Sequence, residues 1–276
     1  INYITQVLLA LIVVANLLVT FTKASASASR ISEILEYSAS IKDELNVDET
    51  NMKTLVKNKE IITFENVSFK YNEEEALSNL SFSIYNGEVF GIIGTTGSGK
   101  STVANLIPRF YDVTKGAVLL GGKDVRKLSQ SFLHEQIGIV PQKSVLFTGT
   151  IADNIKWGKE DATRDEIVEA LKNAQAYEFV SKMEKGIDSH IYEGGKNFSG
   201  GQKQRLTIAR ALVKKPSVII LDDSLSALDY ETDKKLRKSL VENLKDTTKI
   251  IISQRISSII SADKILVLDD GRCVGL

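Results

Sequence analysis

The chain has 276 residues, and its 35 lysines and arginines balance its 35 aspartates and glutamates. This zero net charge argues against a nucleic-acid partner, because binding to phosphate backbones needs an excess of basic residues. The single cysteine, Cys273, excludes an intrachain disulfide, and the two histidines, His134 and His190, show no metal-ligand spacing. The length is ample for one domain with a sizeable core besides an apolar N-terminal segment.

The N-terminal segment, Ile4 to Phe21, is almost entirely apolar and is close to the length of a membrane-spanning helix. Lys23 and Arg30 follow it, which predicts that the downstream side is cytoplasmic. No basic residue precedes the segment, so a secretory signal peptide is not indicated. Its few polar residues suit a helix packed among other spans, but they also leave a buried helix of a soluble domain as the alternative.

Alanine and serine alternate over residues 24–29, and the chain then becomes charged as far as Tyr37. This composition is typical of flexible linkers, yet small residues also permit close helix packing, and we expect residues 24–37 to form a helix. Residues 42–59 are polar and charged, which predicts a surface connection to the following domain.

Residues 94–101 hold the most specific pattern in the chain: a glycine, four residues, a second glycine, a lysine and a serine. The pattern follows the apolar run 89–93, which is typical of a buried strand, and precedes residues 102–107, which favour a helix. A glycine-rich turn that only happens to precede a lysine would not need a strand before it and a helix after it. The segment is therefore predicted to bind the phosphates of a nucleoside triphosphate.

Each residue type in this loop has a chemical reason. Glycines let the backbone approach a polyphosphate, and the N–H groups of the loop and of the helix start form a concave anion site. Lys100 can reach the β- and γ-phosphates, and the hydroxyl of Ser101 can bind Mg²⁺. The residues predicted to contact the nucleotide here are Gly94, Thr95, Thr96, Gly97, Ser98, Gly99, Lys100, Ser101 and Thr102.

A second glycine motif, residues 198–202, opens an amphipathic helix pattern over residues 203–212. Two glycines at a helix start expose N–H groups at the positive end of the helix dipole, here beside a serine hydroxyl. One nucleotide needs one phosphate loop, so we expect this motif to contact a nucleotide held by another subunit. The residues predicted to do so are Ser199, Gly200, Gly201 and Gln202. A serine helix cap followed by a flexible glycine pair is the alternative.

The two motifs, in this order, resemble those of ATP-binding cassette (ABC) transporters, and the resemblance extends over residues 61–276. Residues 198–202 are similar to the signature motif of that family. The resemblance implies an α/β fold of the P-loop NTPase type, with a parallel core sheet, an antiparallel β subdomain and a helical subdomain. It also implies ATP and Mg²⁺ as ligands and an ATPase reaction.

Other segments follow the order of the family. Residues 216–222 form an apolar strand pattern ending in Asp222, as in the Walker B motif, which implies that Asp222 binds Mg²⁺ at the carboxyl edge of the sheet. Gln142 resembles the Q-loop glutamine, which contacts Mg²⁺ and the surroundings of the attacking water. Tyr71 fits the aromatic residue on which adenine stacks, although a strand tyrosine often serves only for packing.

Three features resemble the exporter branch of the family. The Q-loop region, residues 140–151, and residues 109–112 ahead of Gly116 both match the exporter pattern. Glu193 matches the acidic position of the exporter X-loop, which touches the coupling helices of the membrane domain. Both neighbours of Glu193 differ from the usual glycine and arginine, so this contact would be an altered one.

The resemblance divides the chain into three parts. Residues 1–22 would be the end of a last transmembrane helix, residues 23–59 a helical linker and connection, and residues 60–276 a nucleotide-binding domain that lacks its C-terminal end. It implies a multi-pass protein of the cell membrane, in contact with lipid, with the nucleotide-binding domain in the cytoplasm. The transported substrate stays unassigned, because its site would lie in membrane helices outside this sequence.

Two positions depart from the catalytic pattern of the family. Asp223 stands where a glutamate polarises the attacking water, and a misplacement of about 1 Å can cost ~10²-fold in rate. Gln254 stands where a histidine bonds the γ-phosphate, and glutamine cannot carry a positive charge. Together with Gln142, these two are the predicted catalytic positions. With the phosphate loop and the signature intact, the pattern resembles the degenerate-site subunit of heterodimeric exporters.

ABC nucleotide-binding domains pair head to tail, so that each ATP lies between the Walker motifs of one chain and the signature of the other. The sequence therefore predicts a heterodimer with a second half-transporter that supplies its own glutamate and histidine and couples ATP hydrolysis to export. A slow homodimer and a regulatory ATP-binding subunit without its own transport pathway are the alternatives. A soluble ABC ATPase of the chromosome-maintenance or translation type would lack the apolar helix and carry basic surfaces.

Overall fold

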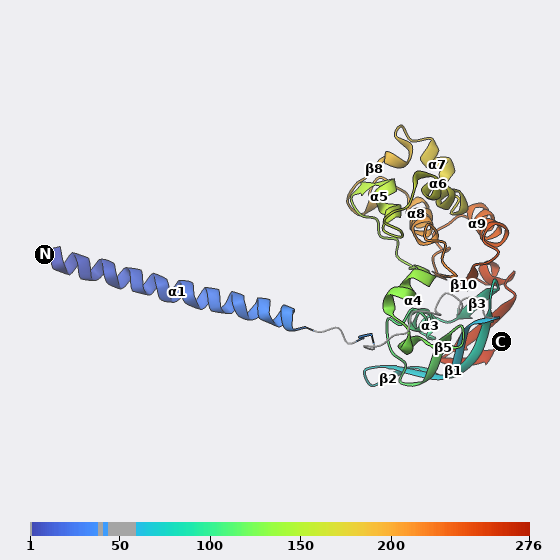
Figure 1. Ribbon diagram of the computed structural model, residues 1–276, viewed down its shortest axis with the longest axis horizontal. Coiled ribbons are helices and arrows are strands. Elements are labelled where there is room, and N and C mark those ends of the chain that lie inside the picture. The colour runs from blue at the N-terminus through green and yellow to red at the C-terminus, as the bar shows by residue number, and fades with distance from the viewer. Residues whose placement is uncertain (1, 38–40, 44–58) are drawn as a thin grey trace. The chain divides into compact units, whose positions relative to one another are not determined.

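The computed structural model describes residues 2–37, 41–43 and 59–276. It divides into two compact units, an N-terminal helix within residues 1–42 and an α/β unit within residues 43–276 (Figure 1). The surface connection expected over residues 42–59 lies almost wholly outside the described residues.

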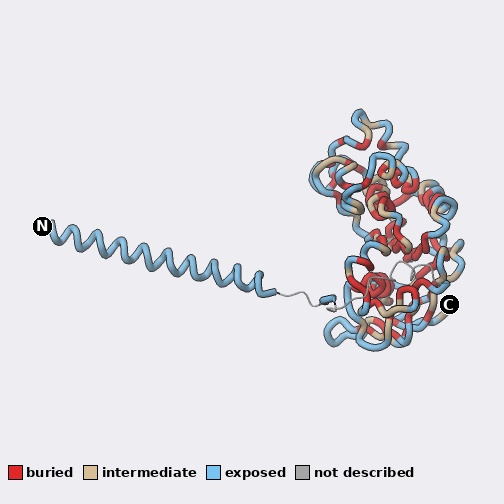
Figure 2. Tube along the Cα trace, viewed as in Figure 1, coloured by how far each residue is buried: buried red, intermediate tan, exposed pale blue. Residues whose placement is uncertain are grey.

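The first unit is one helix, α1 (Asn2–Glu36), of 35 residues. It runs without a break through the apolar segment and the alanine–serine stretch, so the helix expected over residues 24–37 is present as far as Glu36. Alanine is the best helix former, which explains why the stretch does not act as a flexible linker. Figure 2 shows α1 exposed along its described length, and its most apolar window, of mean hydropathy 2.4, is long and apolar enough to cross a membrane.

The α/β unit is built around a six-stranded sheet. In spatial order its strands are β12 (Arg272–Gly275), β11 (Lys264–Asp269), β3 (Val89–Gly94), β10 (Thr248–Ile252), β9 (Val218–Asp222) and β6 (Ile137–Val140). Neighbouring strands are parallel from β11 to β6, whereas β12 pairs antiparallel with β11. Strands covered on both faces are continuous apolar runs, and every residue of β10 is buried. The parallel core sheet expected from the sequence is confirmed.

A second, four-stranded sheet is antiparallel. Its order is β2 (Glu74–Tyr85), β1 (Glu60–Tyr71), β4 (Lys115–Leu120) and β5 (Lys123–Asp124). Phe64 of β1 stacks on Phe82 of β2 with ring centroids 4.5 Å apart, and Phe82 stacks on Phe90 of β3 at 5.4 Å. These rings join the two sheets in one hydrophobic core, so the antiparallel β subdomain is also confirmed.

Helices form the third part, which Figure 1 shows gathered apart from β1 and β2. It contains β7 (Gly149–Thr150), α5 (Ile151–Lys156), α6 (Arg164–Asn173), α7 (Tyr177–Ser181), η2 (Gly186–Asp188), β8 (His190–Ile191), η3 (Glu193–Gly195) and α8 (Gly200–Leu212). Thr150 and Thr163 begin α5 and α6 with capping boxes. The other helices of the unit are α3 (Lys100–Leu106), η1 (Val125–Lys127), α4 (Gln130–Gln136), α9 (Tyr230–Asn243) and α10 (Ile256–Ile259). The expected helical subdomain is thus present.

Candidate functional site

Four of the predicted motifs follow neighbouring strands of the parallel sheet. The strands β3, β10, β9 and β6 lie side by side, and neighbouring strands end within two residues of one another in register. Ile252, the last residue of β10, pairs with Asp222, the last of β9, and with Ile92 of β3. The phosphate loop follows β3, Gln254 follows β10, Asp223 follows β9 and Gln142 follows β6. Open parallel sheets bind ligands at this carboxyl edge. The fold therefore brings residues that are far apart in the sequence to one edge.

The backbone of the phosphate loop depends on its glycines in different ways. Gly97 and Gly99 have φ of 84° and 92°, a region that residues with a Cβ rarely adopt. A Cβ on Gly94 would lie 2.2 Å from the carbonyl oxygen of Leu268, so this glycine permits close packing against β11. Apart from its two chain neighbours, no described residue lies within 4 Å of a Cβ placed on Gly97, so this side of the loop is open.

Lys100 is the first residue of α3, and its side chain folds back onto the loop. Its ammonium donates to the carbonyl oxygens of Gly94, at 2.9 Å, and of Thr95. The residue is 8% exposed, and burial lowers the pKa of the ammonium, while the carboxylates of Asp222 and Asp223 oppose that shift. A partly desolvated cation whose nearest partners are neutral carbonyls attracts anionic oxygens strongly.

Ser101 and Asp222 supply two oxygen ligands for a metal ion, a hydroxyl and a carboxylate, beside this cation. The hydroxyl of Ser101 donates to Oδ1 of Asp222 at 3.2 Å. Burial raises the pKa of Asp222, and the like charge of Asp223 adds to this, so a divalent cation here would relieve an unfavourable pair of carboxylates. Within the described residues there is no group of three or more histidine, cysteine or acidic side chains that could hold a metal alone. Two protein oxygens suit Mg²⁺, which in phosphate sites takes its other ligands from phosphate and water.

Asp223 and Gln142 are in direct contact. Nε2 of Gln142 donates to Oδ2 of Asp223 at 3.1 Å, and the N–H of Asp223 donates to the carbonyl of Ile252 at 2.9 Å. Asp223 has a φ of 44°, an unusual conformation that aspartate tolerates better than most residues. Gln254 is exposed, and its side chain makes no hydrogen bond to any described residue. Two of the three predicted catalytic positions are therefore joined by a hydrogen bond, and Gln254 is not bonded to either of them.

Tyr71 lies at the end of β1, on the antiparallel sheet. It is 38% exposed and packs edge-on against Phe69 and Tyr111, with ring centroids 4.7 and 5.2 Å away. The contacts hold the ring in place and leave part of it exposed, which suits both base stacking and simple packing. Sequence reasoning did not anticipate Tyr111 as the neighbour of Tyr71, because the two residues are distant in the chain.

The signature begins with a helix cap. The hydroxyl of Ser199 accepts from the N–H of Gln202 at 3.3 Å, and Oε1 of Gln202 accepts from the N–H of Ser199 at 2.9 Å. The capping role weighed as an alternative is thus present, but a hydroxyl that accepts one bond keeps its proton for another acceptor. Outside its own helix and chain neighbours, a Cβ on Gly200 would meet no atom of the described residues within 4 Å, so the start of α8 is open to an approaching group.

Sequence reasoning missed one polar residue of α8, Gln204. It is 1% exposed and bonds to the Q-loop through Ser144 and Pro141. A signal was present, because Gln204 lies four residues before the buried Ile208 and so falls on the apolar stripe of the helix.

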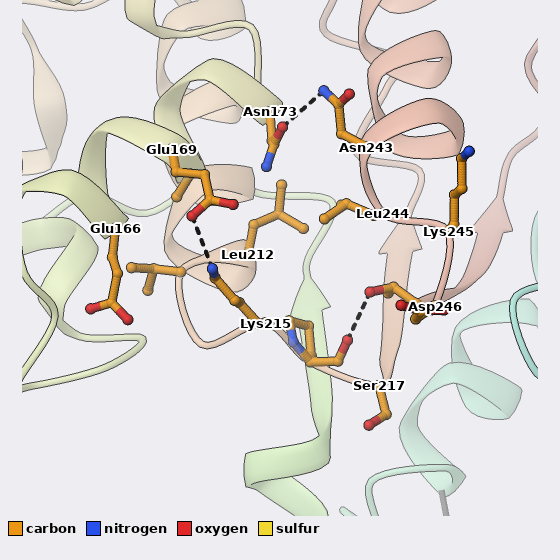
Figure 3. Close-up of a pocket in the computed structure, with 14 residues that line it drawn as sticks. Glu166, Glu169, Asn173, Leu212, Lys215, Ser217, Asn243, Leu244, Lys245 and Asp246 are labelled. Carbon is orange, nitrogen blue, oxygen red and sulfur yellow. Dashed lines mark hydrogen bonds and ion pairs between the residues drawn. The ribbon is translucent and has the colours of Figure 1, made fainter. Parts of the chain in front are cut away.

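A cavity of about 350 Å³ lies at the opposite end of the same strands (Figure 3). Its wall includes Pro216, shortly before β9, and Thr247, which leads into β10. In Figure 3, Glu169 and Lys215 point toward one another and form an ion pair of 2.9 Å. The phosphate loop and the acidic pair follow the carboxyl ends of the strands, so this cavity is not part of the candidate site.

Comparisons with known proteins agree with the geometry. The ABC transporter family matches residues 77–226. The uncharacterized ABC transporter ATP-binding protein YfiB of Bacillus subtilis is 43% identical over 276 residues, covering 99% of this chain and 47% of that protein. An ATP-dependent lipid A-core flippase of Desulfotalea psychrophila is 39% identical over 255 residues, covering 92% of this chain and 44% of that protein. This chain thus spans about half the length of the curated relatives it matches.

A solved structure extends the match to three dimensions. A bacterial Atm1-family ABC exporter with ATP bound superposes with a TM-score of 0.85 at 36% identity, covering 93% of this chain and 44% of that chain. The phosphate loop, the carboxyl-edge acidic pair and the capped signature helix all lie in the matched region. On the family match and this fold, the chain is a member of the ABC transporter family.

Proposed function

We propose that this chain is the ATP-binding portion of one subunit of a heterodimeric ABC exporter, and that its own hydrolytic site is weakened. The exporter would couple ATP binding and hydrolysis to movement of a substrate across the membrane. The observation that carries the proposal is the acidic pair at the sheet edge, where Asp223 is short and bonded to Gln142 while the exposed side chain of Gln254 makes no hydrogen bond to a described residue.

We propose that the groups needed to bind ATP and Mg²⁺ are all present. We assign the phosphates of ATP to residues 94–102, with the ammonium of Lys100 as the main cationic contact. Ser101 and Asp222 would hold Mg²⁺, with Gln142 close by, and the metal would neutralise charge on the phosphates. Tyr71 would stack on adenine with the exposed part of its ring.

The hydrolytic half is weaker for two reasons. A group that polarises water must come within hydrogen-bond reach of it, and the Asp223 carboxylate is one methylene shorter than glutamate and already accepts from Gln142. Gln254 supplies no positive charge toward a γ-phosphate, and such charges contribute a few kcal/mol to a transition state. The site would therefore bind ATP and hydrolyse it slowly.

The signature favours a partner subunit. Ser199 and Gly200 form an open, capped helix start that is suited to a phosphate, and this chain already has a phosphate loop. In a head-to-tail pair that helix start would face the nucleotide of the partner. Two copies of this chain would give two weakened sites, so a partner with intact catalytic residues makes better use of the signature. A slow homodimer and a regulatory ATP-binding subunit remain the alternatives.

Membrane association rests on α1. A single helix with its apolar side chains exposed needs lipid or other helices to cover it, since burying each large apolar side chain is worth ~1.5–3 kcal/mol. We assign residues 1–22 to the end of a span, 23–59 to the linker and 60–276 to a nucleotide-binding domain in the cytoplasm. Glu193, the proposed contact with the membrane part, is 86% exposed and pairs with Lys196 at 3.1 Å.

The full-length half-transporter purified alone and with its partner subunit gives the test. Alone, it should bind MgATP saturably but show little steady-state turnover. Turnover should appear when the partner is present, because the partner brings a competent catalytic site to this signature. Equal turnover per nucleotide site with and without the partner would favour the homodimer, and absence of saturable binding would contradict the proposal altogether.

A further inference from the structure

Gln204 is a buried amide in the second turn of α8. Its Oε1 accepts from the hydroxyl of Ser144, and its Nε2 donates to the carbonyl of Pro141 at 3.5 Å. Both partners lie outside the helix, in the loop that follows β6. A side-chain amide that is 1% exposed is unfavourable unless it is hydrogen-bonded, so these two contacts fix the side chain and the loop to one another.

Under the proposed function, the two groups that Gln204 joins serve different nucleotide sites. On the loop side, Pro141 and Ser144 flank Gln142, whose amide binds the carboxylate of Asp223. On the helix side, Gln204 lies four residues after Gly200, about one turn from the capped start of the signature. One buried side chain therefore links the loop that carries Gln142, the partner of Asp223, to the helix start that would face the partner's nucleotide.

A second set of contacts fixes the rest of the loop to the same helix. Arg210 donates from Nε to the carbonyl of Asn154 at 2.8 Å and from Nη1 to the carbonyl of Val145 at 3.0 Å. Nδ2 of Asn154 in turn donates to the carbonyl of Phe147 at 2.8 Å. These contacts lie farther along α8, so Gln204 is the attachment that is closer both to Gln142 and to the signature.

We propose that Gln204 is a positioning residue that couples the two nucleotide sites of the assembled ATPase. A shift of Gln142 toward a nucleotide and its metal moves Pro141 and Ser144, and Gln204 passes that shift to the first turn of α8. The inference rests on the proposed function, because it assigns the signature to the partner's nucleotide. Coupling of this kind typically amounts to 5- to 150-fold in an equilibrium.

Three substitutions and a matched control isolate the link. Gln204→Met keeps the length and volume of the side chain but removes both hydrogen bonds, and Ser144→Ala removes one of them from the loop side. Ser144→Thr keeps the hydroxyl and should behave as wild type. Thr207→Val is the control, because Thr207 is also buried in α8 but its hydroxyl donates within the helix, to the carbonyl of Lys203 at 3.0 Å.

The experiment uses the full-length half-transporter assembled with its partner subunit. Hydrogen exchange of residues 141–147 and 199–204 is measured with and without MgATP, together with fluorescent-ATP affinity and steady-state ATPase. In Gln204→Met and Ser144→Ala, MgATP should still protect 141–147 but no longer protect 199–204. ATP affinity should stay within about twofold, and kcat should fall about tenfold with little change in KM. Thr207→Val and Ser144→Thr should match the wild type.

Two results would overturn the inference. Protection of 199–204 by MgATP that is unchanged in Gln204→Met would mean that the link does not carry the signal. Exchange of 199–204 that rises equally with and without MgATP would mean that Gln204 only stabilises α8. A separate variant, Ser199→Ala in otherwise wild-type protein, tests the proposed function. If that variant keeps the wild-type ATPase turnover, the proposed function is wrong. The hydrogen-exchange data then still decide whether the loop and the helix are linked.

Discussion

The side-chain amide of Gln142 donates a hydrogen bond of 3.1 Å to the carboxylate of Asp223, across the carboxyl edge of the parallel sheet. The two residues follow the neighbouring strands β6 and β9, and the N–H of Asp223 is held by the carbonyl of Ile252 at 2.9 Å. A change at position 223 therefore alters both the reach of the carboxylate toward a water and its bond to the Q-loop.

Asp223→Glu should recover hydrolysis at this site only in part, by about tenfold, because the longer side chain regains reach while Gln254 still supplies no charge. Adding Gln254→His should give more than the product of the two single effects, since both groups act on one water and one phosphate. Single-turnover hydrolysis confined to this site measures the three variants. A full rate from Asp223→Glu alone would contradict this account of the site.

Lys100→Ala should weaken MgATP binding by about ten- to a hundredfold, because a charge-assisted contact worth ~1.5–3 kcal/mol is lost. Lys123→Ala is the control, since it removes a lysine of β5 that lies outside the predicted contacts. Equilibrium titration with a fluorescent ATP analogue gives both affinities. Equal affinities for the two variants would show that the phosphates bind elsewhere.

Asp222→Asn should change how stability depends on pH. Burial raises the pKa of Asp222 in the folded protein, so its ionised form destabilises the fold relative to the protonated form. The free energy of unfolding contributed by this group falls as pH rises from the ordinary aspartate range through the raised pKa. The free energy of unfolding of Asp222→Asn should therefore increase relative to that of the wild type across that pH window. This gain should shrink when Mg²⁺ is added.

Chemical denaturation at a series of pH values, with and without Mg²⁺, measures this difference. The gain should be absent at pH values below the ordinary aspartate range, where the wild-type carboxyl is protonated in both states. If the wild type instead becomes more stable than Asp222→Asn as pH rises without Mg²⁺, the stability difference has the opposite sign. That result would refute a raised pKa for Asp222.

The sequence predicted those features that are encoded locally. The phosphate loop lies between a buried strand and a helix, and the signature opens an amphipathic helix, so residues within a few positions of each other were sufficient. The parallel sheet, the antiparallel subdomain and the helical subdomain followed from the resemblance to the family. The helix expected over residues 24–37 is present as far as Glu36, because alternating alanine is compatible with a helix as well as with a linker.

The contacts within the site depend on long-range pairing, which local patterns do not contain. Gln142 and Asp223 meet because β6 and β9 are neighbours, although the two residues are 81 positions apart. The packing of Tyr111 on Tyr71 likewise needs the tertiary fold. Gln204 could have been found, because a polar residue on the apolar stripe of a helix requires a buried partner, but the sequence does not name that partner.

The central claim is that this chain gives an intact signature to its partner's site and a weakened catalytic group to its own. Two signature variants and one catalytic variant separate these contributions. Ser199→Ala removes a hydroxyl donor but also the cap of α8, which costs about 1 kcal/mol of stability. Gly200→Asp keeps the cap, and an added Cβ there meets no described residue within 4 Å apart from its own helix and chain neighbours, so the charged side chain should block the approach of a nucleotide while the fold has room for its Cβ.

Steady-state ATPase of the purified two-subunit complex is the most direct measurement. Ser199→Ala and Gly200→Asp should reduce turnover by about 10²-fold or more, because they disable the competent site. Asp223→Asn should change turnover by less than about twofold, because the site of this chain contributes little to it. If Asp223→Asn abolishes turnover as completely as the signature variants do, this chain hydrolyses ATP itself and the account of a weakened site is wrong.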